Sequence, residues 1–144
     1  MAALAADRNT PRAEGVVKSL LMSASLIYAG ALVCRNATGY ATKGAVATTL
    51  IGVGRAEERV DNSAGAAGDK RIRVRTGIFQ FANSASGDLI TIADIGKPAY
   101  VVDDQTVAKT SGTNTRSIAG FVYDVDANGV WVEFDESKVQ AYLT

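Results

Sequence analysis

The sequence predicts an all-β fold, a small β-barrel or β-sandwich with an extended N-terminal arm and little helix. From Val16 onward, short apolar runs are separated by glycine, asparagine, serine and threonine, which is typical of strands joined by turns. Several runs, such as KRIRVR and VWVEF, alternate polar and apolar residues with a period of two. The length of 144 residues is that of one domain. We therefore expect an arm over residues 1–15 and a single β-rich domain over residues 16–144.

Seven strands and two short helical segments are expected in this domain. The strands are placed at Val17–Met22, Ile27–Arg35, Thr48–Arg55, Lys70–Phe81, Ala99–Asp103, Ser117–Val125 and Gly129–Phe134. Helical turns are predicted at Thr91–Ile95 and Glu136–Leu143, because Thr91 and Asp135 can cap them. The small, polar segments 61–68 and 110–115 are expected to be surface loops.

The first fifteen residues, MAALAADRNTPRAEG, show no sustained apolar period and contain a Thr-Pro pair, which favours extended backbone. Fully stretched, they would span about 50 Å at roughly 3.3 Å per residue. We expect an arm that either stays disordered or becomes ordered on a neighbouring molecule.

The composition argues against catalysis. The chain has no histidine, so it lacks the side chain best suited to proton transfer near neutral pH. Zinc would also lack its usual nitrogen and sulfur ligands. The single cysteine, Cys34, lies in a strand-like run and is predicted to be buried and inert. We therefore expect no enzyme, no cofactor and no small-molecule substrate.

Charge and hydropathy also limit the partners. Fifteen basic residues balance fifteen acidic ones, so the surplus positive charge that supports generic nucleic-acid binding is missing. The most apolar stretch, Val16–Val33, is interrupted by Lys18 and Gly30, so no membrane segment is expected. Neither a secretion signal nor a pair of cysteines is recognised, which favours synthesis in the cytosol.

One stretch matches a metal-binding motif. Asp124, Asp126, Asn128 and Gly129, followed by Asp135, fit the spacing of a calcium-binding EF-hand loop. Helices flank such a loop, whereas GFVYDV and VWVEF alternate as strands do. A hairpin turn over residues 126–129, in which asparagine and glycine accept positive φ, is the preferred interpretation, and calcium is the weaker alternative.

Arg71, Arg73 and Arg75 alternate with Ile72 and Val74, so on a strand the three arginines share one face. A solvated outer face is the simpler interpretation, and a contact with an acidic surface of another subunit is the functional one. No aromatic platform is interleaved with the arginines, which makes single-stranded RNA or DNA a poorer fit.

The aromatic and aliphatic residues near the C-terminal half are too numerous for one face of one sheet. They are Ile78, Phe79, Phe81, Phe121, Tyr123, Val130, Trp131, Val132 and Phe134. Most are expected in the core, and those left without an intramolecular partner are expected at an interface.

Taken in order, five segments resemble the small head-decoration (cement) proteins encoded beside the major capsid gene in many tailed phages and prophages. The segments are IYAGALV (27–33), GRAEERVDNSAGA (54–66), RVRTGIFQFANS (73–84), TIADIGKPAYVVDDQTVAKT (91–110) and AGFVYDVDANGVWVEF (119–134). The likeness covers nearly the whole chain after about residue 16 and rests on ordered segments, without a catalytic signature. The C-terminal segment DESKVQAYLT departs from the family pattern, and its role is left open.

The resemblance implies a β-rich domain that binds the outer surface of the assembled capsid, as trimers at three-fold positions, and stabilises the head. The implied partners are the major capsid protein and further copies of the chain, on the virion surface after synthesis in the cytoplasm of the host bacterium. Capsid contacts are expected from the arm residues Arg8, Thr10, Pro11 and Arg12, and subunit contacts from Arg71, Arg73, Arg75, Phe79 and Trp131. Another virion structural protein, such as a tail-tube or head-completion subunit, and a calcium-stabilised binding module remain alternatives. A virion enzyme or recombination accessory factor fits least, because histidine is missing.

Overall fold

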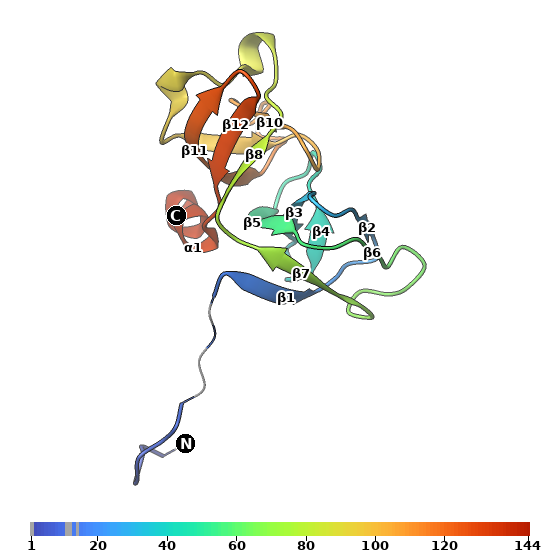
Figure 1. Ribbon diagram of the computed structural model, residues 1–144, viewed down its shortest axis with the longest axis vertical. Helices are drawn as coiled ribbons and strands as arrows, with labels where there is room; N and C mark the ends of the chain where they lie inside the picture. Colours follow the sequence, from blue (N-terminus) through green and yellow to red (C-terminus); the bar gives the residue numbers. More distant parts are fainter. Residues whose placement is uncertain (1, 11–12, 14) are drawn as a thin grey trace.

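The computed structural model describes residues 2–10, 13 and 15–144 and consists mainly of short antiparallel strands (Figure 1). The strands are β1 (Val17–Leu21), β2 (Leu26–Ile27), β3 (Leu32–Arg35), β4 (Ala41–Lys43), β5 (Ile51–Ala56), β6 (Val60–Asp61), β7 (Arg71–Arg75), β8 (Ile78–Phe81), β9 (Pro98–Val101), β10 (Val107–Ala108), β11 (Ile118–Asp126) and β12 (Gly129–Glu133). Two 3-10 turns, η1 (Ser86–Asp88) and η2 (Ile92–Asp94), and one helix, α1 (Glu136–Leu143), complete the secondary structure of the described residues. The prediction of an all-β fold with little helix is confirmed.

Most strands belong to two five-stranded sheets. The first sheet has the order β1-β7-β5-β3-β4 and the second the order β10-β9-β11-β12-β8, while β2 and β6 pair separately. In each sheet an isolated parallel bridge joins the two edges: Met22 with Ala41 in the first, and Ala82 with Thr106 in the second. Within the described part of the chain no continuous ladder closes either sheet, so the molecule consists of two curled sheets and not of one closed barrel.

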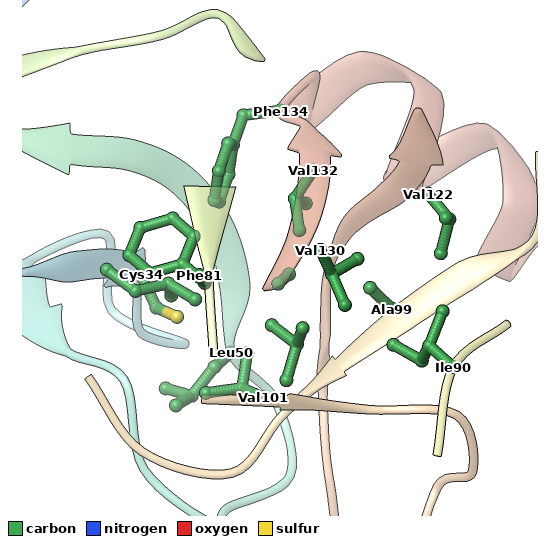
Figure 2. Close-up of a cluster of buried hydrophobic side chains, with 13 residues drawn as sticks. Cys34, Leu50, Phe81, Ile90, Ala99, Val101, Val122, Val130, Val132 and Phe134 are labelled. Atoms are coloured by element: carbon green, nitrogen blue, oxygen red, sulfur yellow. The ribbon is translucent and has the colours of Figure 1, made fainter. Parts of the chain in front are cut away.

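Each curled sheet has its own apolar core. The first core includes Met22, Ile27, Val33, Val53, Ile72 and Val74. The second core includes Phe81, Ile90, Val101, Val130, Val132 and Phe134 (Figure 2). Leu32, Cys34 and Leu50 also join the second core, so β3 sends Val33 to one core and its two neighbours to the other. Successive side chains of β3 therefore connect the two halves of the molecule, each half being one curled sheet with its core.

The backbones of the two sheets come into close contact at Gly52 on β5. A Cβ atom at this position would lie 1.8 Å from the carbonyl oxygen of Ala119 on β11. Real side-chain atoms do not approach so closely, so the contact between the halves requires glycine at this position.

Two of the strand predictions are wrong in one respect, because each predicted strand forms two separate strands in the structure. Lys70–Phe81 forms β7 in the first sheet and β8 in the second, with Gly77 between them at a φ of 150°. Ile27–Arg35 splits into β2 and β3 around Gly30, whose φ is 83°. Glycine adopts such angles without the steric penalty of other residues, so it allows the chain to leave one sheet and enter the next. The other five predicted strands are confirmed to within a few residues, whereas β4, β6 and β10 are too short to produce an apolar run.

Both predicted helix caps are confirmed. The Thr91 hydroxyl accepts a hydrogen bond from the Ala93 amide, and the Asp135 carboxylate accepts one from the Lys138 amide at 3.1 Å. In η2, Asp94 completes a reciprocal capping box with Thr91.

Helix α1 is fastened to the first sheet through Glu136. Its carboxylate accepts hydrogen bonds from Arg35 on β3, at 2.9 and 3.1 Å, and from Lys18 on β1 at 3.0 Å. Val139 is fully buried in a cluster with Ile118 and Phe121 of the second sheet. The C-terminal segment therefore packs against both halves of the fold.

Candidate interaction surfaces

The free edge of β1 is one candidate interaction surface. The Thr76 amide donates to the Val16 carbonyl and the Met22 amide to the Lys70 carbonyl, both at 2.9 Å. Hydrogen-bonded pairs alternate along an antiparallel ladder, so the backbone groups of Val17, Ser19 and Leu21 point away from β7. Among the described residues no strand pairs with this edge. The edge can therefore accept an additional strand.

A side chain partly caps this edge. The Arg71 guanidinium donates to the Ser19 carbonyl at 3.1 Å. Val17 and Leu21, which precede and follow Ser19 on the same face of β1, are 41% and 38% exposed. The edge strand therefore presents free backbone groups together with a small apolar surface.

The predicted alternation of the arginine row is confirmed, because Arg71, Arg73 and Arg75 are exposed while Ile72 and Val74 are fully buried. Two glutamates of the same chain pair with this row. Glu58 accepts from Arg73 at 3.3 Å, and Glu57 accepts from Arg75 and, at 3.2 Å, from Arg55.

These pairs also influence the glutamates. The hydrogen bond from Arg75 lowers the pKa of Glu57, and the Arg73 backbone amide lowers that of Glu58. Much of the charge of the row is thus neutralised within the molecule. This geometry suits a solvated face, with Arg71 as the arginine lacking a carboxylate partner among the described residues.

Phe79 and Trp131, both predicted as subunit contacts, face opposite sides of the second sheet. Phe79 is paired with Val132, whereas Trp131 is paired with Gln80, and successive residues of a strand point to opposite faces. Phe79 packs against Phe134 with ring centroids 6.2 Å apart, and the Arg55 guanidinium lies 4.5 Å from its centroid. The structure therefore groups Phe79 with Arg55 and Phe134 and not with Trp131.

The hairpin predicted at residues 126–129 is confirmed, since β11 and β12 pair from Asp126 and Gly129. Gly129 has a φ of 151°, whereas Asn128 does not take the positive φ expected of it. The Asp126 carboxylate accepts from the Asn128 amide at 2.8 Å and from the Trp131 indole N–H at 2.9 Å, and these hydrogen bonds lower its pKa.

The calcium alternative finds no assembled ligand set here. Asp135 caps α1, and Asp124 lies on β11 beside the hairpin. No group of three or more acidic, histidine or cysteine side chains comes together among the described residues.

The remaining candidate residues are those of the N-terminal arm and Cys34. Arg8 and Thr10 are exposed, and the described residues 2–10 contain no helix or strand and lie away from the body of the molecule (Figure 1). Pro11 and Arg12 lie outside the described residues. Cys34 is fully buried as predicted, and burial raises the pKa of its thiol to about 12.

Sequence reasoning missed the surroundings of Tyr100 and Tyr142, where two hollows lie side by side. Their residues come from four distant segments, and no local pattern could have grouped them.

Comparisons with known proteins identify no relative, since no family model, no curated protein and no solved structure matches the chain. No helix among the described residues has the length and apolar character needed to cross a bilayer.

Proposed function

We propose that this chain is a decoration protein of a tailed-phage head, which binds the outer surface of the assembled capsid and stabilises it, as a trimer at three-fold positions. The observation that carries the proposal is the continuity between the exposed arm and the free edge of β1. The order of segments that resembles decoration proteins supports the same function.

In this proposal the exposed residues 2–10 and the edge of β1 both contact the capsid. An extended partner segment can pair with the outward backbone groups of Val17, Ser19 and Leu21, while the arm continues along the partner surface. Pairing of this kind displaces the Arg71 side chain from the Ser19 carbonyl. It then leaves that guanidinium free for a carboxylate of the partner.

Stabilisation of the head follows from the thermodynamic linkage between binding of this protein and assembly of the shell. A protein that binds the assembled shell, and not its separate subunits, adds its binding free energy to the stability of the assembled state. Several copies that each touch more than one capsid subunit need only modest individual contacts.

Mixing the purified chain with empty heads tests the proposal. We expect a trimer in light scattering, saturation of the heads at hundreds of copies, and a higher temperature of head rupture. A dozen copies or fewer per particle would indicate a tail-tube or head-completion subunit instead.

The role of the β1 edge can be tested by a substitution in that strand. Ser19→Pro removes the outward N–H of the edge and leaves the ladder to β7 intact, because proline is tolerated where the amide faces away from the sheet. We expect Ser19→Pro to fold as a trimer and to lose head binding, while the control Ser19→Ala retains it. Undiminished head binding by a folded Ser19→Pro protein would contradict the role of the edge.

A further inference from the structure

Two adjacent hollows lie beside the C-terminal end of α1, and Tyr100 and Tyr142 line both of them. Each hollow has a volume of about 330 Å³, at the lower end of the range for small-molecule sites, about 300–1,000 Å³. Tyr142 is 57% exposed, and its ring meets that of Phe121 edge-on at 5.9 Å between centroids. An aromatic surface is therefore held in place and is accessible from solvent.

The polar side chains that line the first hollow are uncharged except for Arg116. They include the hydroxyls of Thr48, Thr49 and Ser111 and the amide of Asn114. The side-chain nitrogen Nδ2 of Asn114 makes no hydrogen bond among the described residues, so it can donate to a ligand, whereas Oδ1 of the same side chain accepts from the Ser111 hydroxyl at 3.5 Å. Apolar side chains of Leu50 and Ile118 form part of the wall. The hollow combines neutral hydrogen-bonding groups with aromatic and aliphatic surface.

Three cations line the hollows, and two carboxylates lie close to them. Lys97 and Lys109 lie 3.9 and 4.0 Å from the buried Asp94, and Arg116 lies 3.2 Å from Asp88. Arg116 and Asp88 neutralise each other beside the first hollow, and a neutralised pair provides little net attraction for a phosphate or a carboxylate. At the second hollow Lys97 and Lys109 share Asp94, which leaves one positive charge in solvent that can donate hydrogen bonds. The electrostatics of the first hollow therefore favour an uncharged ligand.

The backbone at the rim of the first hollow is held in an unfavourable conformation. Thr49 and Asn114 have φ values of 67° and 63°, in the left-handed region. A β-branched residue is a genuine outlier there, and such conformations persist only where the surroundings enforce them, commonly at binding sites.

We infer that the two hollows bind a neutral oligosaccharide, with one sugar ring on each side of Tyr142. A pyranose ring has a C–H face that packs against an aromatic ring, whose face is electron-rich. Its hydroxyl groups match the uncharged donors and acceptors of the rim. This site is separate from the arm and the β1 edge, so it adds a second binding activity to the proposed function and does not depend on it.

The test is an NMR titration of the full-length ¹⁵N-labelled chain with maltose, cellobiose and N,N′-diacetylchitobiose in turn. We expect at least one of the three disaccharides to cause saturable shifts centred on the amides of Tyr100, Asn114 and Tyr142. Tyr142→Ala is expected to weaken this binding about tenfold, through loss of the stacked ring. Tyr142→Phe keeps the ring and is expected to retain most of the affinity.

Two further variants separate binding from folding. Asn114→Gly suits the left-handed backbone and removes the side-chain amide together with its weak 3.5 Å hydrogen bond to Ser111, so it is expected to weaken binding without loss of structure. Tyr123→Ala removes a tyrosine of nearly equal exposure, 56%, that lines neither hollow, and it is expected to leave binding unchanged.

The inference is overturned if none of the three sugars causes a saturable shift, or if Tyr123→Ala loses as much affinity as Tyr142→Ala. It is also overturned if the signals of the residues lining the hollows shift with protein concentration in the absence of sugar. That result would show that a second copy of the chain occupies the hollows. Head binding by the same variants is measured separately, so failure of this site leaves the capsid proposal to its own test.

Discussion

The two curled sheets share an architecture but differ in how their edges are used. In the second sheet, the Ala82 amide donates to the Gln105 carbonyl at 2.8 Å, and the Val107 amide donates to Ala82 at 3.0 Å, so both edges meet. In the first sheet the Ser23 amide donates to the Ala41 carbonyl at 2.9 Å beside the Met22 bridge, while the backbone groups of Val17, Ser19 and Leu21 stay open. Both sheets are thus joined at one end of their edges, and they differ in that the open edge of β1 follows directly after the N-terminal segment.

The two halves also differ in the surfaces that they carry. The first half carries the arm, the open edge and the arginine row. The second half contributes most of the walls of the two hollows, together with the end of α1. The protein contacts that we propose therefore lie in the first half, and the ligand site that we propose lies mainly in the second half.

The largest expected effect is at the junction of the two halves. Gly52→Ala places a Cβ against the Ala119 carbonyl of the opposite backbone, and we expect loss of more than about 4 kcal/mol of folding free energy, or failure to fold. Gly87→Ala is the matched control, because nothing lies within 4 Å of its added Cβ. Thermal unfolding by circular dichroism measures both. A Gly52→Ala protein as stable as the control would show that the halves can separate without cost.

A matched pair of core variants asks whether the halves unfold together. Val74 in the first core and Val132 in the second are both fully buried, so each Val→Ala change is expected to cost about 2–3 kcal/mol. Because β3 packs into both cores, we expect one shared unfolding transition that shifts equally in the two variants. Two separate transitions in calorimetry, each moved by one variant alone, would indicate independent units.

A smaller effect is expected at Glu136, which ties α1 to the first sheet. Burial alone would raise its pKa, but hydrogen bonds from Arg35 and Lys18 outweigh burial and hold the pKa below its usual value of 4.5. Because the folded pKa lies below the unfolded one, the stabilisation is present above about pH 4.5 and is lost as the pH falls through the folded pKa.

Glu136→Gln is therefore expected to lower stability at pH 7 by about 1–3 kcal/mol and to flatten the loss of stability on acidification. Glu133→Gln, which breaks the more exposed pair with Lys138, serves as the control and is expected to have a smaller effect. Urea unfolding at pH 7, 5 and 3 compares the two. Identical pH profiles for Glu136→Gln and the unmodified chain would contradict the assigned role.

Local patterns in the sequence determined much of this protein. The alternation around Arg73, the caps at Thr91 and Asp135, the hairpin that starts at Asp126 and the burial of Cys34 all follow from the nearest neighbours along the chain. Such features depend on side-chain period and on hydrogen bonds between residues a few positions apart, so they can be recognised without the fold.

Only the tertiary structure decided which segments meet. It broke the run around Gly77 between two sheets, brought Gly52 against Ala119, paired Glu136 with residues more than one hundred positions away, and assembled the hollows around Tyr100 and Tyr142. The period-two pattern states that a strand has a buried face, but it carries no information about which surface covers that face. The choice of partner depends on long-range packing, in which many apolar runs of similar length and composition compete.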